Sequence, residues 1–242
     1  MKSNLSALLI SLSVVIASIV LATAFINRNK TEEQISVTGL GTYDFTSDLV
    51  VWKGRFTRLE KELSLAYEKL DQDREMIRQY MKEQGLKEEE FYFSAIDIGK
   101  EYNYTYDQHG NQRKDFEGYR LYQGIEIESR DVDKIEALSR DISTIIQKGI
   151  EFSSDRPQYY YTQLSELKIE MIAKATADGR IRAEQIAENS KAELGKLKEA
   201  RMGVFQIIGK NSNEDYSWGG SFNTMSKEKT ATITMKLEFA IE

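Results

Sequence analysis

The N-terminal segment contains the feature that constrains this chain most, a run of 25 residues without a charge between Lys2 and Arg28. A helix of that length extends roughly 37 Å, which exceeds the hydrocarbon core of a bilayer at about 30 Å. Two interpretations stay open. Residues 5–26 have the length and apolarity of an uncleaved transmembrane helix, whereas the small residues that end at Ala24 provide a cleavage site for a signal peptide. Residues 1–30 are therefore predicted to be a membrane anchor or signal segment, and either one takes the rest of the chain out of the cytoplasm.

The remaining residues, 31–242, show two kinds of apolar spacing. Apolar residues at every second position indicate a strand, and apolar residues three or four positions apart indicate a helix with one buried face. The predicted strands are at 35–43, 49–57, 90–107, 118–129, 149–154, 198–209 and 231–241, and the predicted helices are at 60–84, 131–148 and 162–189. The order β-β-α-β-β-α-β-α-β-β predicts an α+β domain with a mixed, partly antiparallel sheet, built as one body or as two lobes.

Composition is typical of a globular domain, and it argues against nucleic-acid binding and against stabilisation by disulfides. The chain is 40% hydrophobic and 30% charged, which is typical of soluble domains. Its net charge of −6 at pH 7 gives no basic surface for nucleic acid. Cysteine is absent, so stability has to come from burial of apolar side chains rather than from disulfides.

A G-x-G pair, Gly39 and Gly41, invites comparison with a nucleotide-binding loop. A dinucleotide fingerprint needs a third glycine and a helix that begins directly after the loop. Here the next predicted element is another strand, at 49–57. Glycine inside a strand more often marks a bulge or a close backbone approach, so we expect a structural role for the pair.

The side chains that most enzymes use are scarce. His109 is the only histidine and lies in a predicted hairpin turn, so one chain cannot form a histidine pair for zinc. No serine occurs in a G-x-S-x-G turn. The carboxylates cluster in charged runs that are typical of solvated helix faces. We therefore expect a protein that is not an enzyme and that has no catalytic residue, cofactor or metal.

Two groups of tyrosines are candidates for a binding site. Tyr102, Tyr104 and Tyr106 alternate along one strand and so share a face, and three more at 159–161 precede the third helix. An exposed tyrosine row could stack on sugar rings or fill a partner surface, and a covered row would line a helix–sheet interface. In the first case the Tyr-rich strand and the polar loop at 209–229 would together form a site for a glycan or small molecule.

The third predicted helix is rich in small residues. One stripe joins positions 173, 177, 180, 184 and 187, three of them alanine, and the adjoining row adds Ala175, Gly179 and Ala183. Small residues let a helix approach a sheet or another helix closely, so the stripe faces either the chain's own sheet or a second copy. Apolar residues remain on other faces, and a partly antiparallel sheet has exposed edges. We therefore expect residues 31–242 to form a homo-oligomer at micromolar concentration.

Several segments occur in an order that resembles the SIMPL-domain family of bacterial periplasmic and envelope proteins. They are VTGLGTYDFTSD at 37–48, GL at 85–86, GYRLYQGIEIESRD at 118–131, KGIEFSSD at 148–155 and ADGRIRAEQIAENSKAELGKL at 177–197. The resemblance extends from about residue 35 to residue 242. Ser47 and Gly179 depart from it, since the family often has proline and alanine there.

The resemblance implies the family's fold and a place in the cell envelope, but no catalytic residue. It implies a protein that acts by self-association or by binding a partner, in envelope stress or integrity. The domain would lie in the periplasm, either on a single inner-membrane anchor or released after cleavage near Ala24.

Overall fold

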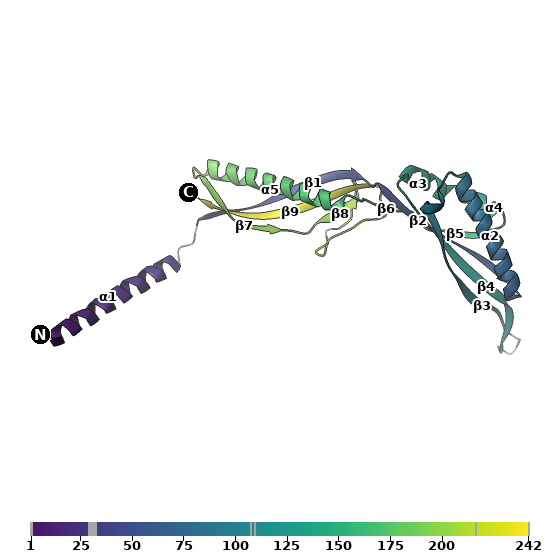
Figure 1. The fold of residues 1–242 in the computed structure, drawn as a ribbon, viewed down its shortest axis with the longest axis horizontal. Coiled ribbons are helices and arrows are strands. Elements are labelled where there is room, and N and C mark those ends of the chain that lie inside the picture. The colour runs from purple at the N-terminus through teal and green to yellow at the C-terminus, as the bar shows by residue number, and fades with distance from the viewer. Residues whose placement is uncertain (1, 29–32, 107, 109, 216, 242) are drawn as a thin grey trace. The chain divides into compact units, whose positions relative to one another are not determined.

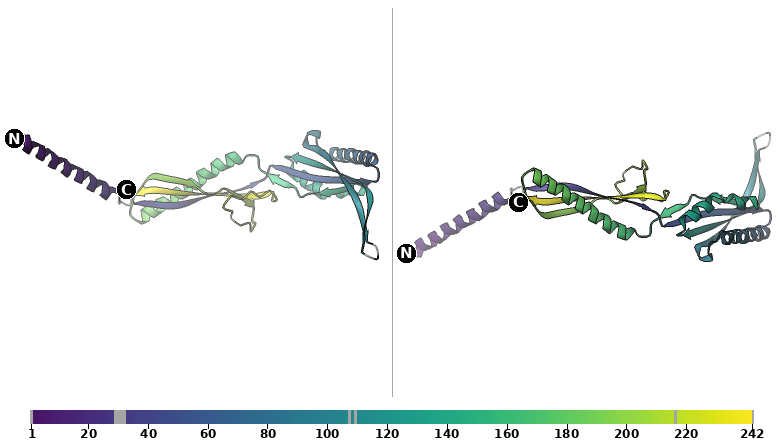
Figure 2. Two further views of the ribbon diagram at one scale, coloured as in Figure 1. Left: turned by 90° about the horizontal axis from the view of Figure 1, so that it is seen from below. Right: turned by 90° about the horizontal axis from the view of Figure 1, so that it is seen from above.

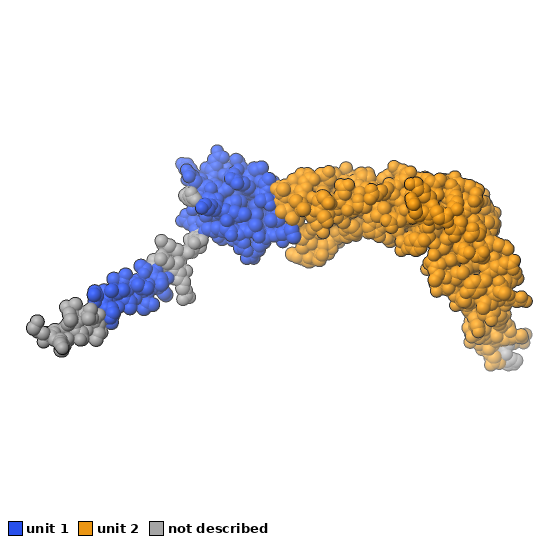
Figure 3. Space-filling model, viewed as in Figure 1, with its two compact units in different colours: residues 1–39, 176–202, 235–242 blue, residues 40–175, 203–234 orange. Residues whose placement is uncertain are grey.

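The computed structural model describes residues 2–28, 33–106, 108, 110–215 and 217–241. The chain forms an N-terminal helix followed by two sheets and their helices, which confirms the expected α+β class (Figure 1). It divides into two compact units, one with residues 1–39, 176–202 and 235–242 and the other with residues 40–175 and 203–234 (Figure 3).

The helices and strands follow one another along the chain without long gaps, except before β9. They are α1 (Lys2–Arg28), β1 (Gln34–Thr46), β2 (Leu49–Glu60), α2 (Leu63–Glu83), the short 3₁₀ helix η1 (Glu88–Glu90), β3 (Phe91–Tyr106), β4 (Gln112–Ser129), α3 (Val132–Arg140), α4 (Ser143–Gln147), β5 (Glu151–Ser154), β6 (Gln158–Tyr160), α5 (Leu164–Asn189), β7 (Leu194–Met202), β8 (Gln206–Gly209) and β9 (Glu228–Ile241).

The N-terminal segment is helical over α1. Its hydroxyl groups bond within the helix: Ser18 Oγ donates to the Val14 carbonyl at 2.8 Å, and Thr23 Oγ1 donates to the Ile19 carbonyl at 2.6 Å. Among the helices that the structure describes, none combines the length and the apolarity that crossing a membrane requires. A transmembrane segment over residues 5–26 stays a prediction.

The first sheet has β9 at its centre. Its strand order is β1-β9-β7, and β8 also pairs with β9. Both β7 and β8 run antiparallel to β9. At one end the Ile241 N–H donates to the Glu33 carbonyl at 3.2 Å, and at the other the Thr46 hydroxyl donates to the Glu228 carboxylate at 3.0 Å. The start of β1 therefore meets the end of β9, so these two strands are also antiparallel.

Helix α5 lies along one face of the first sheet (Figures 1 and 2). Every fourth residue of one row is buried: Leu167, Met171, Ala175, Gly179, Ala183 and Ala187. A Cβ atom on Gly179 would lie 2.7 Å from Leu237 Cδ1 and 3.3 Å from the Gly39 backbone, so a side chain there would push the helix away. Of the two alternatives for the stripe through Ala173 and Ala177, packing on the chain's own sheet is wrong, because both residues are exposed and the adjoining row makes the contact. Contact of these residues with a second copy stays a prediction.

The second sheet is antiparallel in all four of its pairings. Its order is β3-β4-β2-β5, and β6 pairs with β2 next to β5. Strands β2 and β4 pair over their whole shared length, from Val50 opposite Ser129 to Glu60 opposite Tyr119. The β3–β4 hairpin continues past that point, so its outer part is a two-stranded ribbon.

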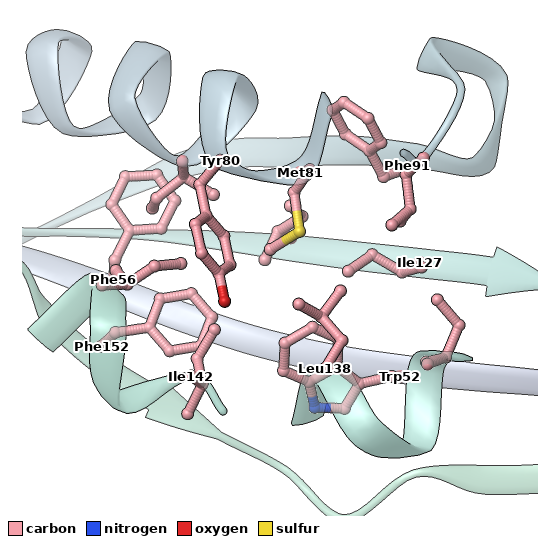
Figure 4. Close-up of a cluster of buried hydrophobic side chains, with 14 of the residues drawn as sticks. Trp52, Phe56, Tyr80, Met81, Phe91, Ile127, Leu138, Ile142 and Phe152 are labelled. Atoms are coloured by element: carbon pink, nitrogen blue, oxygen red, sulfur yellow. The ribbon is translucent and has the colours of Figure 1, made fainter. Parts of the chain in front are cut away.

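The hydrophobic core lies between the second sheet and helices α2 and α3 (Figure 4). The alternation of β2 directs Trp52 and Phe56 into it, and both are fully buried. Gly54 lies between them on the same face. A side chain at Gly54 would overlap the Phe152 ring. The absence of one leaves room for this ring in the core.

A charged pair joins α2 to the edge of this core. The Arg58 guanidinium donates to both carboxylate oxygens of Asp73, which is buried, and one of these bonds is 2.7 Å long. The carboxylate raises the pKa of Arg58. Such a pair fixes the position of the helix on β2, because removing Arg58 would leave the buried Asp73 carboxylate without a partner.

Five details of the predicted elements are corrected. Strand β2 continues to Glu60, so Leu59 belongs to the sheet and α2 begins at Leu63. The helix predicted at 131–148 is two helices, and the strand predicted at 198–209 is divided into β7 and β8. The predicted sheet is two sheets, and β6 was not predicted.

Candidate functional site

The described residues contain no cluster of conventional catalytic or metal-binding groups. Within them, no three His, Asp or Glu side chains gather in a way that could hold a metal ion. His109 lies outside the described residues, so the prediction that it is a surface turn residue is untested. The G-x-G pair lies beneath α5, where a Cβ atom on Gly41 would be 2.6 Å from the Met171 carbonyl oxygen. This is the close packing that the sequence predicted.

The outer part of the β3–β4 hairpin forms what we call the arm, residues 101–106 and 112–118. One face of the arm is aromatic and cationic, because Tyr102 is opposite Phe116 and Tyr104 is opposite Lys114. Tyr106, at the tip, is 69% exposed. The three tyrosines therefore share a face as predicted, and the outer two are exposed rather than covered by a helix.

Lys114 organises the aromatic face of the arm. Its Nζ lies 3.7 Å from the centre of the Tyr102 ring and 5.8 Å from that of Tyr104, which are cation–π distances. The Phe116 ring packs between Tyr102 and Tyr119, with centroids 5.7 and 5.2 Å apart. The result is a ribbon of partly exposed rings that carries a positive charge.

The second tyrosine group and the 209–229 loop belong elsewhere. Tyr159 is buried in β6, and the Tyr161 ring packs on Phe45 at 4.7 Å, so this group is structural. The loop is held by β6 and β8: the Tyr159 N–H donates to the Thr224 carbonyl at 2.7 Å, and Gln206 Nε2 donates to the Ser217 carbonyl at 2.8 Å. The structure does not join the loop and the arm into one site.

Lys229, at the start of β9, is a buried cation that the sequence reasoning missed. It is 1% exposed, and its Nζ donates to the Tyr159 carbonyl and lies 5.7 Å from the centre of the Phe222 ring. Burial away from water lowers the pKa of its amino group to about 8, and the Glu214 carboxylate opposes this shift. The lysine therefore ties β9 to β6.

The outer face of the second sheet contains a hollow of about 490 Å³ that was also missed. Its lining comes from four neighbouring strands: Lys53, Gly54, Arg55 and Thr57 of β2, Tyr92 and Ser94 of β3, Tyr122, Gly124, Ile125 and Glu126 of β4, and Ser153 with the nearby Asp155 from β5. The volume lies within the roughly 300–1,000 Å³ of small-molecule sites. The sequence contained one indication of the hollow, a glycine at position 124 inside a strand of alternating polarity.

One ion pair closes one side of this hollow. Lys53 Nζ is 2.8 Å from the Glu126 carboxylate. Its hydrogen bond lowers the pKa of Glu126, and the Tyr92 hydroxyl lowers it further. The same interactions raise the pKa of Lys53 and of Tyr92. Glu126 is therefore ionised and already bonded at neutral pH.

A second hollow, which we call the α5 groove, follows the side of α5 next to β1. It has a volume of about 620 Å³ and is lined by Ser36, Val37, Thr38, Ile181, Arg182, Gln185 and Ile186. Ile181 is 59% exposed and Ile186 is 45% exposed. The helix row that packs on the sheet leaves these two side chains on the surface.

Comparison with protein families accounts for nearly the whole chain. A family model named SIMPL, described as "Protein of unknown function (DUF541)", matches residues 35–239. Among curated proteins, none matches the sequence significantly. The matched region contains both sheets, the arm, the hollow on the outer face of the second sheet and the α5 groove. Because the match covers far more than half of the chain, this protein belongs to the SIMPL family.

Proposed function

We propose that this protein is a non-enzymatic component of the bacterial cell envelope that acts by self-association, in envelope stress or integrity. Residues 5–26 would hold it at the inner membrane with residues 31–242 in the periplasm. Membership of the SIMPL family and the uncharged residues 3–27 of the N-terminal helix support the location. The scarcity of catalytic side chains in the sequence supports the non-enzymatic role.

The α5 groove is the observation that carries self-association. Ile181 and Ile186 are large aliphatic side chains that are exposed and line the same groove, on a helix whose other face already packs on the sheet. Full burial of one such side chain contributes about 1.5–3 kcal/mol. In a two-fold symmetric contact the same patch occurs on both subunits, so each groove would receive isoleucines of the other copy.

Light scattering of residues 31–242 tests this proposal. We expect the wild-type fragment to have a mass of at least twice the monomer mass of about 25 kDa. A variant with both Ile181→Glu and Ile186→Glu should have a single mass near 25 kDa. A charge in each isoleucine position would have to be buried without a partner, which opposes association.

Ile169→Glu is the matched control, because Ile169 is exposed on the same helix but does not line the groove. This variant should keep the wild-type mass. A wild-type fragment that is monomeric at micromolar concentration would contradict the proposal, as would a groove variant that associates like the wild type.

The arm supports a second candidate, a module that binds a glycan or small molecule. Its exposed tyrosine rings and the positive charge of Lys114 suit a sugar ring that stacks on one aromatic face. The 209–229 loop is not part of this candidate, because its contacts are with β6 and β8. In a titration with glucuronate and glucose, a lower affinity of Tyr104→Ser for either sugar would support it, and an unchanged affinity would contradict it.

A further inference from the structure

The hollow on the outer face of the second sheet is open because of Gly124. The Gly124 N–H donates to the Ser94 hydroxyl at 2.9 Å, and Ser94 lies where the register of β3 and β4 shifts. A Cβ atom on Gly124 would lie 3.1 Å from the Ser94 oxygen. The glycine therefore forms a low floor, and Tyr122 and Glu126 rise on either side of it along the same strand face.

Arg55 lies directly across from this floor, because it pairs with Gly124 in the β2–β4 register. Its side chain is exposed, and no ion-pair partner for it occurs among the residues that the structure describes. Lys53, the other cation of the hollow, is already paired with Glu126. The hollow thus offers one unengaged guanidinium, which binds a carboxylate through two parallel hydrogen bonds.

The rest of the lining suits a hydroxylated ring. Tyr122 and Ser153 supply hydroxyl groups, and the Asp155 carboxylate can accept hydrogen bonds from ligand hydroxyls. The hydroxyls of Tyr92 and Ser94 are already bonded within the protein. Ile125 borders the hollow, but its side chain is buried in the core on the other face of the sheet. The rings of Tyr92 and Tyr122 provide apolar surface of the kind on which sugars stack.

We propose that this hollow binds a sugar acid, a pyranose that carries one carboxylate, with Arg55 as the residue that recognises the carboxylate. The Arg55 guanidinium can pair with one carboxylate, whereas Lys53 is occupied by Glu126 and the Asp155 carboxylate would repel the second charge of a phosphate dianion. The proposal does not depend on self-association or on the arm.

Isothermal titration of the full-length protein in detergent micelles tests the proposal, with D-glucuronate and D-glucose as the probes. The two sugars share the ring and differ at the carboxylate. We expect glucuronate to bind more tightly than glucose, and Arg55→Gln to lower glucuronate affinity about ten- to hundredfold, since a hydrogen bond to a charged group is lost. Added salt should weaken glucuronate binding and leave glucose binding unchanged.

Two control variants make the result specific. Arg130→Gln removes the same charge from an exposed arginine outside the hollow and should leave both affinities unchanged. Tyr104→Ser changes the arm and should also leave them unchanged. Thermal unfolding of Arg55→Gln should match the wild type, because Arg55 is exposed.

The proposal is overturned if glucuronate does not bind, if glucose binds equally well, or if Arg55→Gln and Arg130→Gln bind alike. Loss of binding in Tyr104→Ser but not in Arg55→Gln would assign the sugar to the arm and would also overturn it. A failure of self-association in light scattering leaves this titration unaffected, so the two proposals fail separately.

Discussion

Lys229 is a lysine whose side chain is buried in an apolar environment at the start of β9. Its amino group bonds to the Tyr159 carbonyl, and its pKa is lowered to about 8 because burial opposes the charged form. In the unfolded chain a lysine has its ordinary pKa of 10.5. Below about pH 8 both states carry the proton, and the cost of burying the charge is fully present.

We predict that the wild type gains stability relative to Lys229→Met as the pH rises from about 8 to 10.5. In this window the unfolded chain binds the proton and the folded chain releases it, so the free energy of unfolding rises with pH. The difference should change by up to about 1.4 kcal/mol per pH unit. Urea unfolding of residues 31–242 at several pH values measures it.

Lys196→Met is the control for this experiment, because it removes an exposed lysine from β7. Its stability should run parallel to that of the wild type across the same pH range. A constant difference between wild type and Lys229→Met from pH 7 to 10 would show that the buried amino group does not titrate in this window.

The sequence contained part of the signal for Lys229. The apolar residues of the last strand occupy odd positions from Ala231 onward, and Lys229 has the same parity, so it belongs to the buried face. The carbonyl that accepts the hydrogen bond from Lys229 could not be predicted from this pattern. Tyr159 is 70 residues earlier, and only the folded chain brings its carbonyl to the lysine.

At the scale of the elements, the contact between α5 and the first sheet depends on the absence of a side chain at Gly179. We predict that Gly179→Leu lowers the free energy of unfolding by about 1–3 kcal/mol or more, because the new side chain would overlap Leu237 and the Gly39 backbone. Urea unfolding of residues 31–242 measures the change.

Ala177→Leu, two residues away on the exposed side of α5, is the matched control. It should change stability by less than about 0.5 kcal/mol, because the side chain enters solvent. Equal losses in the two variants would mean that the Gly179 row is not the packed row.

Periodicity predicted nearly every element but not the breaks inside them. The helix predicted at 131–148 is interrupted because the hydrogen bonds change there from four residues to three: the Thr144 N–H donates to the Asp141 carbonyl, and the Ile145 N–H donates to the Ile142 carbonyl. Apolar spacing of three or four fits both bond patterns, so it could not reveal the change.

The candidate site was less predictable than the fold. The tyrosine row was visible because three alternating residues share a strand face. The hollow combines side chains of four strands whose order in the sheet, β3-β4-β2-β5, is not the order of the sequence. Strand order depends on long-range pairing, and a single sequence does not contain that information in its local pattern.

At the scale of the whole molecule, the proposed anchor at residues 5–26 would determine where the protein is held. We predict that full-length protein produced in bacteria stays in the membrane fraction after a carbonate wash, and that mass spectrometry finds peptides from residues 5–26. An apolar segment of this length is retained by a bilayer because its transfer to water exposes the entire helix surface.

A variant that lacks residues 1–30 provides the control for this fractionation and should appear in the soluble fraction. Release of the full-length protein by carbonate would contradict the anchor. A mature chain that begins at Phe25 would instead support cleavage of a signal peptide.

The pairing of β1 with β9 also sets an order of folding events. All strands of the second sheet lie between Leu49 and Tyr160, so this sheet can form before the rest of the chain is available. Strand β1 precedes that region, and its partner in the sheet begins only at Glu228. Contacts between residues so far apart in sequence form slowly, because a large loop must close first. Strand β1 therefore stays unpaired until nearly the whole polypeptide is available, and the domain folds from its middle outward.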